Sequence, residues 1–291
     1  MANSINTNAG ALVALQNLNQ TSRDLSITQN RVNTGQKISS AKDNGAIFAI
    51  ATSQRAEMGA QDAVKQSLQR GQSIVDVALS AGETVTNALN ELKSLAVAIQ
   101  DDAGGAAAFT DNGKKLVADY EAIVKEIHTS LAGAKFDGVN LFDAIGAAPA
   151  TAVQVSTNTS GGKFMLKDIS TPSAGAGLVF GGTATAAGVW STVATDAVKK
   201  TTYTAANVET AINGFATVLA DLGTKSKSLD RQLVFTSKMQ DALEVGIGNL
   251  VDADLAKESA KLTALQTKQQ LGVQALSIAN QSSSVLLGLF R

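Results

Sequence analysis

The two ends of this chain combine helical apolar periodicity with an almost complete lack of charge. Residues 1–22 carry no charged side chain, and residues 262–290 carry only Lys268. A solvated surface helix normally presents a charged face, whereas a membrane-spanning helix would exclude the repeated Gln, Asn and Ser of residues 262–290. We therefore expect both ends to lie inside a protein assembly, against surfaces that are themselves polar or wet.

The apolar residues of the first segment repeat at the spacing of a coiled coil. Leu18, Leu25 and Val32 recur every seven residues, and we expect Leu12 and Leu15 to extend the same stripe toward the N-terminus. The pattern predicts a helix from about residue 3 to residue 34, stopped by the glycine that follows, and a final helix over residues 252–290.

Two arrangements of these end helices fit the periodicity. In the first, the ends are disordered in the isolated subunit and fold when many subunits associate, because isolated helices are marginal without tertiary packing. In the second, the two ends simply form an intramolecular coiled coil.

The middle of the chain is predicted to be helical with a small β insert. Residues 46–100 form one long Ala-rich helix, and we expect Gly59, Gly71 and Gly82 either to admit a close neighbour or to interrupt it. A second helix is predicted over residues 112–132 and a third over residues 206–246.

The insert is predicted from a change in amino-acid composition and in the spacing of apolar residues. Apolar residues around positions 153–155 and 164–166 suggest two strands, and residues 157–162 between them are typical of a hairpin turn. Residues 171–204 are rich in Thr, Ser, Ala and Gly and are expected to form a β-rich surface subregion or loop.

The expected fold class is mainly α, with long terminal coiled-coil helices, a helical bundle and a small β-hairpin-rich insert. The expected domains are a terminal coiled coil of residues 1–34 and 252–291, a linker of residues 35–45, a helical domain of residues 46–150 and 206–251, and a β-rich surface insert of residues 151–205.

The composition removes several classes of function. The chain has no Cys and one His, which excludes disulfides, thiolate nucleophiles and His-based metal clusters. Its 24 Lys+Arg against 25 Asp+Glu leave no electrostatic footprint for nucleic acid. Polar residues interrupt the N-terminal apolar run, so we expect neither a signal peptide nor membrane insertion. We expect that the protein is not an enzyme and that it binds no cofactor.

Several segments, taken together and in order, resemble bacterial flagellins. Arg31–Asn44 is similar to the family's Arg-Leu-Ser-Ser-Gly…Ile-Asn-Ser-Ala-Lys-Asp-Asp stretch, and Asp252–Ser259 is similar to its Asp-x-Asp-x-Ala-x-Glu motif. Shorter similarities lie at Ser4–Asn8, Leu15–Leu18, Phe136–Phe142 and Gln281–Leu289. The resemblance covers most of the chain and leaves about residues 170–205 unmatched.

The resemblance implies a filament subunit. Its terminal helices would pair as the inner tube of the flagellar filament, the next helices and a β-hairpin region would form an outer tube, and the insert would project from the surface. The subunit would be exported unfolded through the flagellar type III apparatus, with an export chaperone, filament cap and junction proteins as partners, and would polymerise with itself outside the cell.

Two other classes of protein with helical termini are alternatives to a filament subunit. A hook–filament junction protein shares flagellin-like termini but would match the terminal motifs less fully. A secreted coiled-coil adhesin or injectisome component would not carry both terminal motifs.

The residues expected to act are interface positions. The expected polymerisation interface is Leu12, Leu15, Leu18, Leu25, Val32, Leu262, Leu265, Leu276, Leu286 and Phe290. In some flagellins the insert carries O-linked glycans, and the corresponding candidates here are Thr183, Thr185, Ser191 and Thr195.

We predict that Leu276→Asp abolishes polymerisation and leaves the middle helices folded, because it places a charge in the apolar stripe of the final helix. Electron microscopy after seeding with filament fragments, together with far-UV circular dichroism, measures both effects. Filaments of normal length would count against the coiled-coil assignment.

Overall fold

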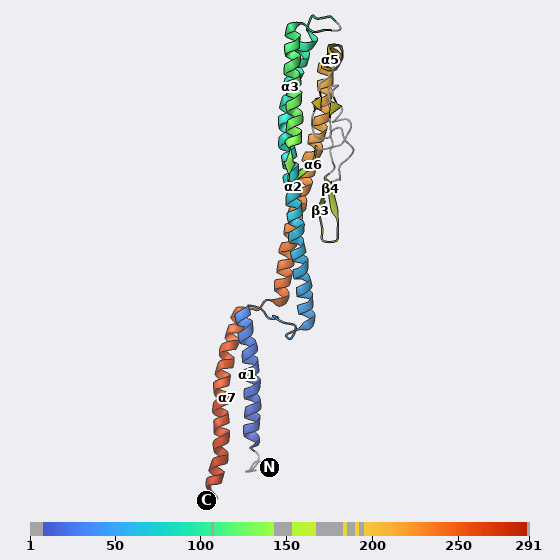
Figure 1. The fold of residues 1–291 in the computed structure, drawn as a ribbon. Coiled ribbons are helices and arrows are strands. Elements are labelled where there is room, and N and C mark those ends of the chain that lie inside the picture. The colour runs from blue at the N-terminus through green and yellow to red at the C-terminus, as the bar shows by residue number, and fades with distance from the viewer. Residues whose placement is uncertain are drawn as a thin grey trace. The chain divides into compact units, whose positions relative to one another are not determined.

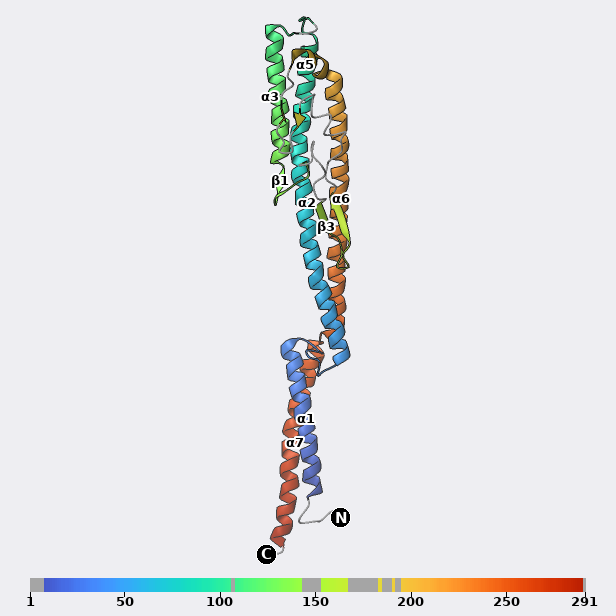
Figure 2. The same ribbon diagram turned by 45° about the vertical axis from the view of Figure 1, so that its right-hand side comes forward.

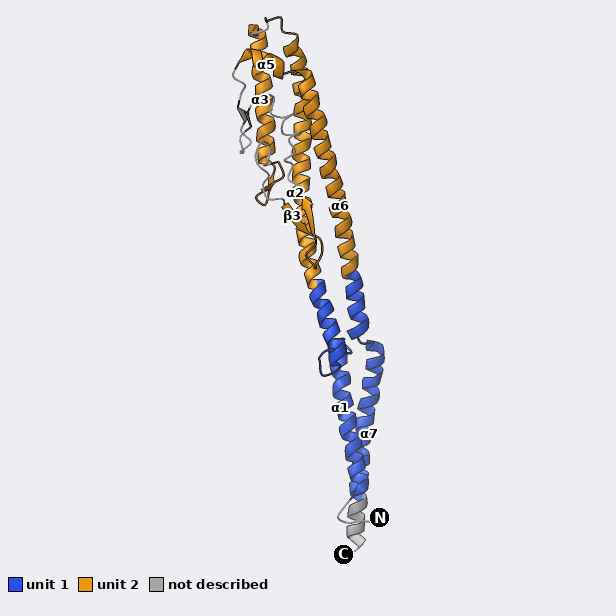
Figure 3. Cartoon of the chain, turned by 90° about the vertical axis from the view of Figure 1, so that its right-hand side faces the viewer, with its two compact units in different colours: residues 1–58, 241–291 blue, residues 59–240 orange. Residues whose placement is uncertain are grey.

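The computed structural model describes residues 8–105, 108–142, 153–166, 183–184, 190–191 and 195–289, with the backbone alone at 183–184, 190–191 and 282–289. The fold is mainly α, with a small β insert, as the sequence predicts (Figure 1). The chain divides into two compact units, which are described separately (Figure 3): Met1–Met58 with Asp241–Arg291, and Gly59–Gln240. We call them unit 1 and unit 2.

Unit 1 contains the first and last helices. Helix α1 (Ala9–Thr34) lies beside helix α7 (Leu255–Leu289) in both views of the ribbon (Figures 1 and 2). The start of α2 (Gly45–Gln100) and the end of α6 (Ala205–Val251) complete the unit. Ala51 of α2 is buried against Ile247 and Val251 of α6, which forms a small apolar cluster.

Capping side chains set the ends of these helices. Helix α1 begins at Ala9 and not at about residue 3, because the Asn8 side chain accepts a hydrogen bond from the Ala11 backbone N–H at 3.0 Å. It ends as predicted at Gly35, whose φ of 70° is the left-handed conformation that favours glycine. Helix α7 begins at Leu255 and not at residue 252, because Asp254 accepts from the Lys257 backbone N–H at 3.1 Å. Helix α6 runs to Val251, beyond the predicted end at residue 246.

Unit 2 is an elongated bundle in which α2, α3 (Asp111–Gly133) and α6 run alongside one another (Figure 2). The predicted second helix is confirmed, and its apolar stripe points into the core. The largest fully buried side chains come from all three helices and their neighbours: Tyr120, Tyr203, Phe215, Leu68, Leu89, Leu92, Ile127, Leu141, Leu166, Leu222 and Leu229. His128, the one histidine, is also buried.

Helix α2 runs without interruption for 56 residues, so its glycines do not break it. Two of them admit close neighbours instead. A Cβ at Gly71 would lie 2.5 Å from Val155 Cγ2, and one at Gly82 would overlap the Leu219 side chain. A Cβ at Gly59 would meet nothing within 4 Å. A neighbouring side chain therefore lies close to two of the three glycines, and at Gly71 that neighbour is the stiff, buried Val155.

The predicted hairpin forms and packs onto unit 2. Strand β3 (Val153–Ser156) pairs antiparallel with β4 (Lys163–Leu166), and the Thr157 backbone N–H donates to the Gly162 carbonyl at 2.9 Å across the predicted turn. Val155 is buried, and the Ser156 backbone N–H donates to Ser67 Oγ of α2 at 3.1 Å.

A second, unpredicted hairpin joins β1 (Lys135–Phe136) to β2 (Val139–Asn140). Its two turn residues have positive φ angles, 50° at Asp137 and 75° at Gly138. Asp-Gly is a strong sequence signal for a two-residue hairpin turn, so the sequence did contain the information.

The expectation of a β-rich subregion or loop over residues 171–204 is wrong at its C-terminal end. Strands β5 (Thr183–Ala184) and β6 (Trp190–Ser191) do pair antiparallel, but Asp196–Thr202 forms helix α5. Tertiary contacts override the weak helical propensity of this segment. Lys199 of α5 lies 2.7 Å from the Glu121 carboxylate, and Tyr203, just after α5, stacks on Tyr120 at 4.4 Å between ring centroids.

We predict opposite effects from the same substitution at two glycines of α2. Gly59→Ala has open space and should raise stability by up to about 1 kcal/mol through helix propensity. Gly71→Ala gains the same propensity but must displace the stiff, buried Val155, which costs about 1–3 kcal/mol, so stability should fall. Thermal unfolding of both variants by circular dichroism measures the difference, and equal stabilisation of both would contradict the close packing at Gly71.

Candidate assembly interface

Helices α1 and α7 meet along one seam, in which the least exposed positions alternate at spacings of three and four residues. This alternation is the signature of coiled-coil packing. On α1 the seam comprises Ala11, Ala14, Leu18, Thr21, Leu25, Thr28 and Val32. On α7 it comprises Leu262, Leu265, Gln269, Gly272, Leu276 and Ala279.

Specific contacts along its length fix the seam as antiparallel. Near the chain termini, the Asn8 side-chain amide donates to the Ala279 carbonyl at 2.7 Å. In the middle, a Cβ at Gly272 would lie 3.2 Å from Leu18 Cδ1. At the far end, Arg31 Nη1 lies 3.1 Å from Glu258 Oε1.

Beyond the ion pair, backbone hydrogen bonds join the two connectors of unit 1. One connector, residues 35–44, links α1 to α2, and the other, residues 252–254, links α6 to α7. The Ala253 N–H donates to the Gly35 carbonyl at 2.9 Å, and the Lys37 N–H donates to the Val251 carbonyl at 2.6 Å. Gln36 and Asp252 form the antiparallel bridge between these bonds. The two long segments that carry the flagellin resemblance, separated by more than 200 residues in the sequence, therefore meet at one junction.

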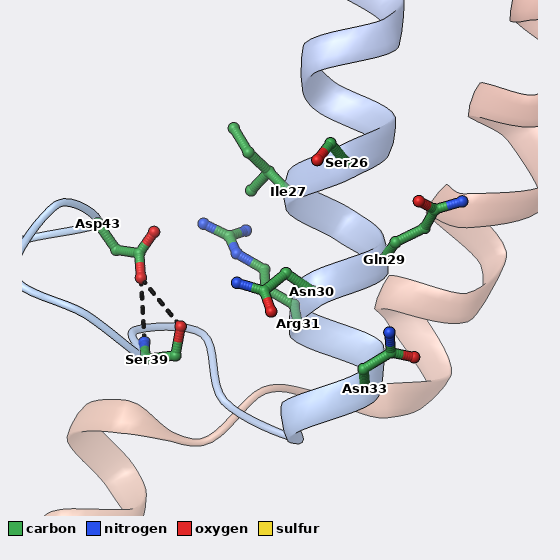
Figure 4. A pocket seen from close by; sticks show the side chains of 8 residues that line it. All are labelled: Ser26, Ile27, Gln29, Asn30, Arg31, Asn33, Ser39 and Asp43. Carbon is green, nitrogen blue, oxygen red and sulfur yellow. Dashed lines mark hydrogen bonds between the residues drawn. The ribbon is translucent and has the colours of Figure 1, made fainter.

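A compact turn completes the connector between α1 and α2. The Asp43 carboxylate accepts from the backbone N–H groups of Ser40 and Ser39 at 3.0 and 3.1 Å and also from both hydroxyls. These bonds, led by that of the Ser40 backbone, hold the pKa of Asp43 below its usual value. A polar cavity of about 350 Å³ separates this turn from α1 (Figure 4). Its lining includes Arg31 and Asp43.

Many seam positions near the chain termini carry small residues. The seam there combines Ala11, Ala14, Gly272 and Ala279 with Leu276, whereas several large aliphatic side chains face outward. The exposed aliphatic residues are Leu12 at 59%, Val13 at 57%, Leu15 at 44%, Leu271 at 58%, Val273 at 54% and Ile278 at 67%. Soluble monomers rarely leave such apolar patches uncovered, so these faces are candidates for contact with other protein.

The structure brings six of the ten expected interface leucines and related residues into the seam. They are Leu18, Leu25, Val32, Leu262, Leu265 and Leu276. The expectation that Leu12 and Leu15 extend this stripe is wrong: each follows a seam alanine by one residue, which rotates it about 100° around the helix and away from α7. The Leu286 backbone is helical but its side chain is outside the described residues, as is Phe290 altogether.

Sequence reasoning missed the small and polar members of the seam. The sequence prediction considered only large apolar residues and therefore omitted Ala11, Ala14, Thr21 and Thr28, although their alternating spacing is present in the sequence. It also missed the pairing of Arg31 with Glu258. Both residues lie inside the segments that resemble flagellins, but neither segment alone indicates which residue of the other its charged side chain contacts.

The expected glycosylation residues fall at the edge of what is described. Thr183 and Ser191 lie in β5 and β6, whose backbones alone are described, and Thr185 lies outside the described residues. Thr195 is exposed and immediately precedes α5.

Within the described part of the chain, no cluster of three or more His, Cys, Asp or Glu side chains could hold a metal ion. None of the helices in that part is long and apolar enough to cross a membrane.

Comparison with known proteins places this architecture in a family. Residues 5–147 match the bacterial flagellin N-terminal helical region, and residues 205–290 match the bacterial flagellin C-terminal helical region. Flagellins FljK and FljM of Caulobacter vibrioides are each 49% identical to this chain over 99% of both sequences. A flagellin of Brucella melitensis is 38% identical, again over 99% of both. The chain therefore belongs to the bacterial flagellins, and it is a structural subunit of the flagellar filament that polymerises with itself.

Proposed function

We propose that the outward apolar faces of α1 and α7 are the surfaces through which copies of the chain polymerise. The observation that carries this proposal is the exposure of leucine, valine and isoleucine side chains on the outward faces near the chain termini, where alanine and glycine occupy most of the seam positions between the helices. Burial of an aliphatic side chain contributes about 1.5–3 kcal/mol, and within the described α1–α7 pair these side chains do not obtain it. Neighbouring subunits would supply that burial.

The expected interface residues then divide into two roles. Leu18, Leu25 and Val32, with their partners on α7, would hold one subunit's helices together. Leu12 and Leu15 would contact other subunits. A contact between different surfaces of identical subunits generates an open helical filament when its rotation does not close a ring.

We also propose that α1 and α7 become stably helical only on assembly. Small and polar residues occupy much of their seam, and a two-helix pair has little core of its own. This weakness suits a subunit that is exported unfolded through the flagellar type III apparatus, with an export chaperone, and polymerises under a filament cap outside the cell.

In the assembled filament, we place residues 1–34 and 252–291 in the inner tube and residues 46–150 and 206–251 in the outer tube. Residues 35–45 link the two, and residues 151–205 project from the surface. The chain has a purely structural role, without enzymatic activity. Full-length similarity to flagellins supports this reading over a hook–filament junction protein.

We predict that Ile278→Asp blocks polymerisation and leaves the fold of unit 2 unchanged. Ile278 is 67% exposed, so the carboxylate is solvated in the monomer but would be buried without a partner in the filament. The critical concentration for growth from filament seeds should rise by at least about a hundredfold. Ile278→Val keeps the apolar surface and should assemble normally; assembly of the Asp variant at the same critical concentration would refute the assignment of this face.

We further propose O-glycosylation within the insert at Thr183, Thr185, Ser191 or Thr195, of which Thr195 is exposed. The protein isolated from native filaments should then exceed the 29.8 kDa of the bare chain in intact-mass measurement, and Thr195→Ala should remove part of the excess. An intact mass equal to that of the bare chain would remove the proposal.

A further inference from the structure

The seam between α1 and α7 is repetitive and has few features that specify its alignment. A shift by one heptad moves α7 about 10.5 Å along α1 and again places seam positions against seam positions. Leu18, now beside Gly272, would face the neighbourhood of Leu265 or Ala279. Either shifted pairing remains apolar, so packing alone discriminates weakly between registers.

One charged pair lies at the edge of this seam. The side chains of Arg31 and Glu258 are only 26% and 13% exposed, and their charged atoms lie 3.1 Å apart. The remaining Arg31 Nε and Glu258 Oε2 atoms are buried and make no other hydrogen bond. Separating the pair leaves the largely buried Glu258 carboxylate without this partner, whereas Arg31 also lines the polar cavity beside Asp43.

A one-heptad shift separates this pair in either direction. Moving α7 one way sets Arg31 near Leu265, and moving it the other way sets Glu258 near Leu25. Other charged residues of the two helices, such as Arg23 and Lys261, are exposed and can remain solvated in every register.

The backbone bonds between the connectors do not perform the same selection. They join carbonyl and amide groups that every residue carries, and the connector of residues 35–44 between α1 and α2 offers the same groups at its other positions. The ion pair joins two side chains, so its formation depends on the identity of both residues.

We infer that Arg31 and Glu258 are positioning residues that select the register of α1 against α7. This role goes beyond membership of the filament, because it concerns the alignment of two helices within one subunit. The alignment decides which outward residues of α1 lie level with which residues of α7, and hence the composite surface that a subunit offers its neighbours.

The absence of Cys from the chain allows register to be read directly by engineered disulfides. A Cβ at Gly272 would lie 3.9 Å from Leu18 Cβ, within the range for a disulfide. Leu18→Cys with Gly272→Cys reports the observed register. Leu18→Cys with Leu265→Cys, or with Ala279→Cys, reports the two shifted registers. Non-reducing gels and peptide mapping separate crosslinks within a chain from those between chains.

The test compares apolar replacement with charge reversal, using each disulfide reporter in the full chain after seeding with filament fragments. With Arg31→Leu and Glu258→Leu together, the helices should still pair, but shifted crosslinks should increase by at least about tenfold over the parent chain. Arg31→Glu with Glu258→Arg should restore the Leu18–Gly272 crosslink. Arg23→Leu with Lys261→Leu, which removes two exposed charges, should change nothing.

Two results would overturn the inference. Retention of only the Leu18–Gly272 crosslink in the double-leucine variant would show that packing and the connectors suffice. Shifted crosslinks in the parent chain would show that the pair does not select a register. The inference rests on the proposed folding of α1 and α7 on assembly, so crosslinks are scored in pelleted filaments. Absence of filaments from the parent chain would count against the proposed polymerisation surface, whereas the identity of the crosslink within filaments tests the register.

Discussion

The antiparallel contact between the first and last helices is the constraint on which the rest of unit 1 depends. It joins residues more than 200 positions apart, so the chain between α1 and α7 must begin and end at the same junction. The connectors are bonded to each other, and Ile38 is buried within the unit, only because α1 ends where α7 begins. The two sequence motifs of the family are, in physical terms, the two sides of this junction.

Periodicity in the sequence was sufficient to predict the long helices, because the apolar spacing of a helix is set by residues that are close together in the chain. The stripe of α3, the glycine that ends α1 and the turn between β3 and β4 were all legible from residues close together in the chain. The ends of helices were less accurately predicted, since Asn8 and Asp254 act through single capping bonds that many polar residues could have made.

What could not be predicted depends on residues distant in sequence. Helix α5 is short and has little intrinsic stability; its lysines find Glu121 and the backbone of the loop after α2 only once the bundle has formed. Likewise, Arg31 and Glu258 are ordinary charges until the fold brings them together. The misassignment of Leu12 and Leu15 has a different origin: counting large apolar residues assumes that they face inward, and near these termini the smaller residues do.

The exposure of these larger side chains also bears on how a helix pair with little core of its own could take part in a stable filament. Near the termini, alanine and glycine occupy most seam positions, and the larger side chains on the outward faces remain exposed, available to the neighbouring subunits that we propose. Little free energy is then gained by pairing within one chain, and more is gained when neighbours cover the outer faces. A pair held mainly by its own core would fold early and gain less from association. On the proposed polymerisation surface, assembly and the folding of the chain's ends would therefore be driven by burial of the same side chains.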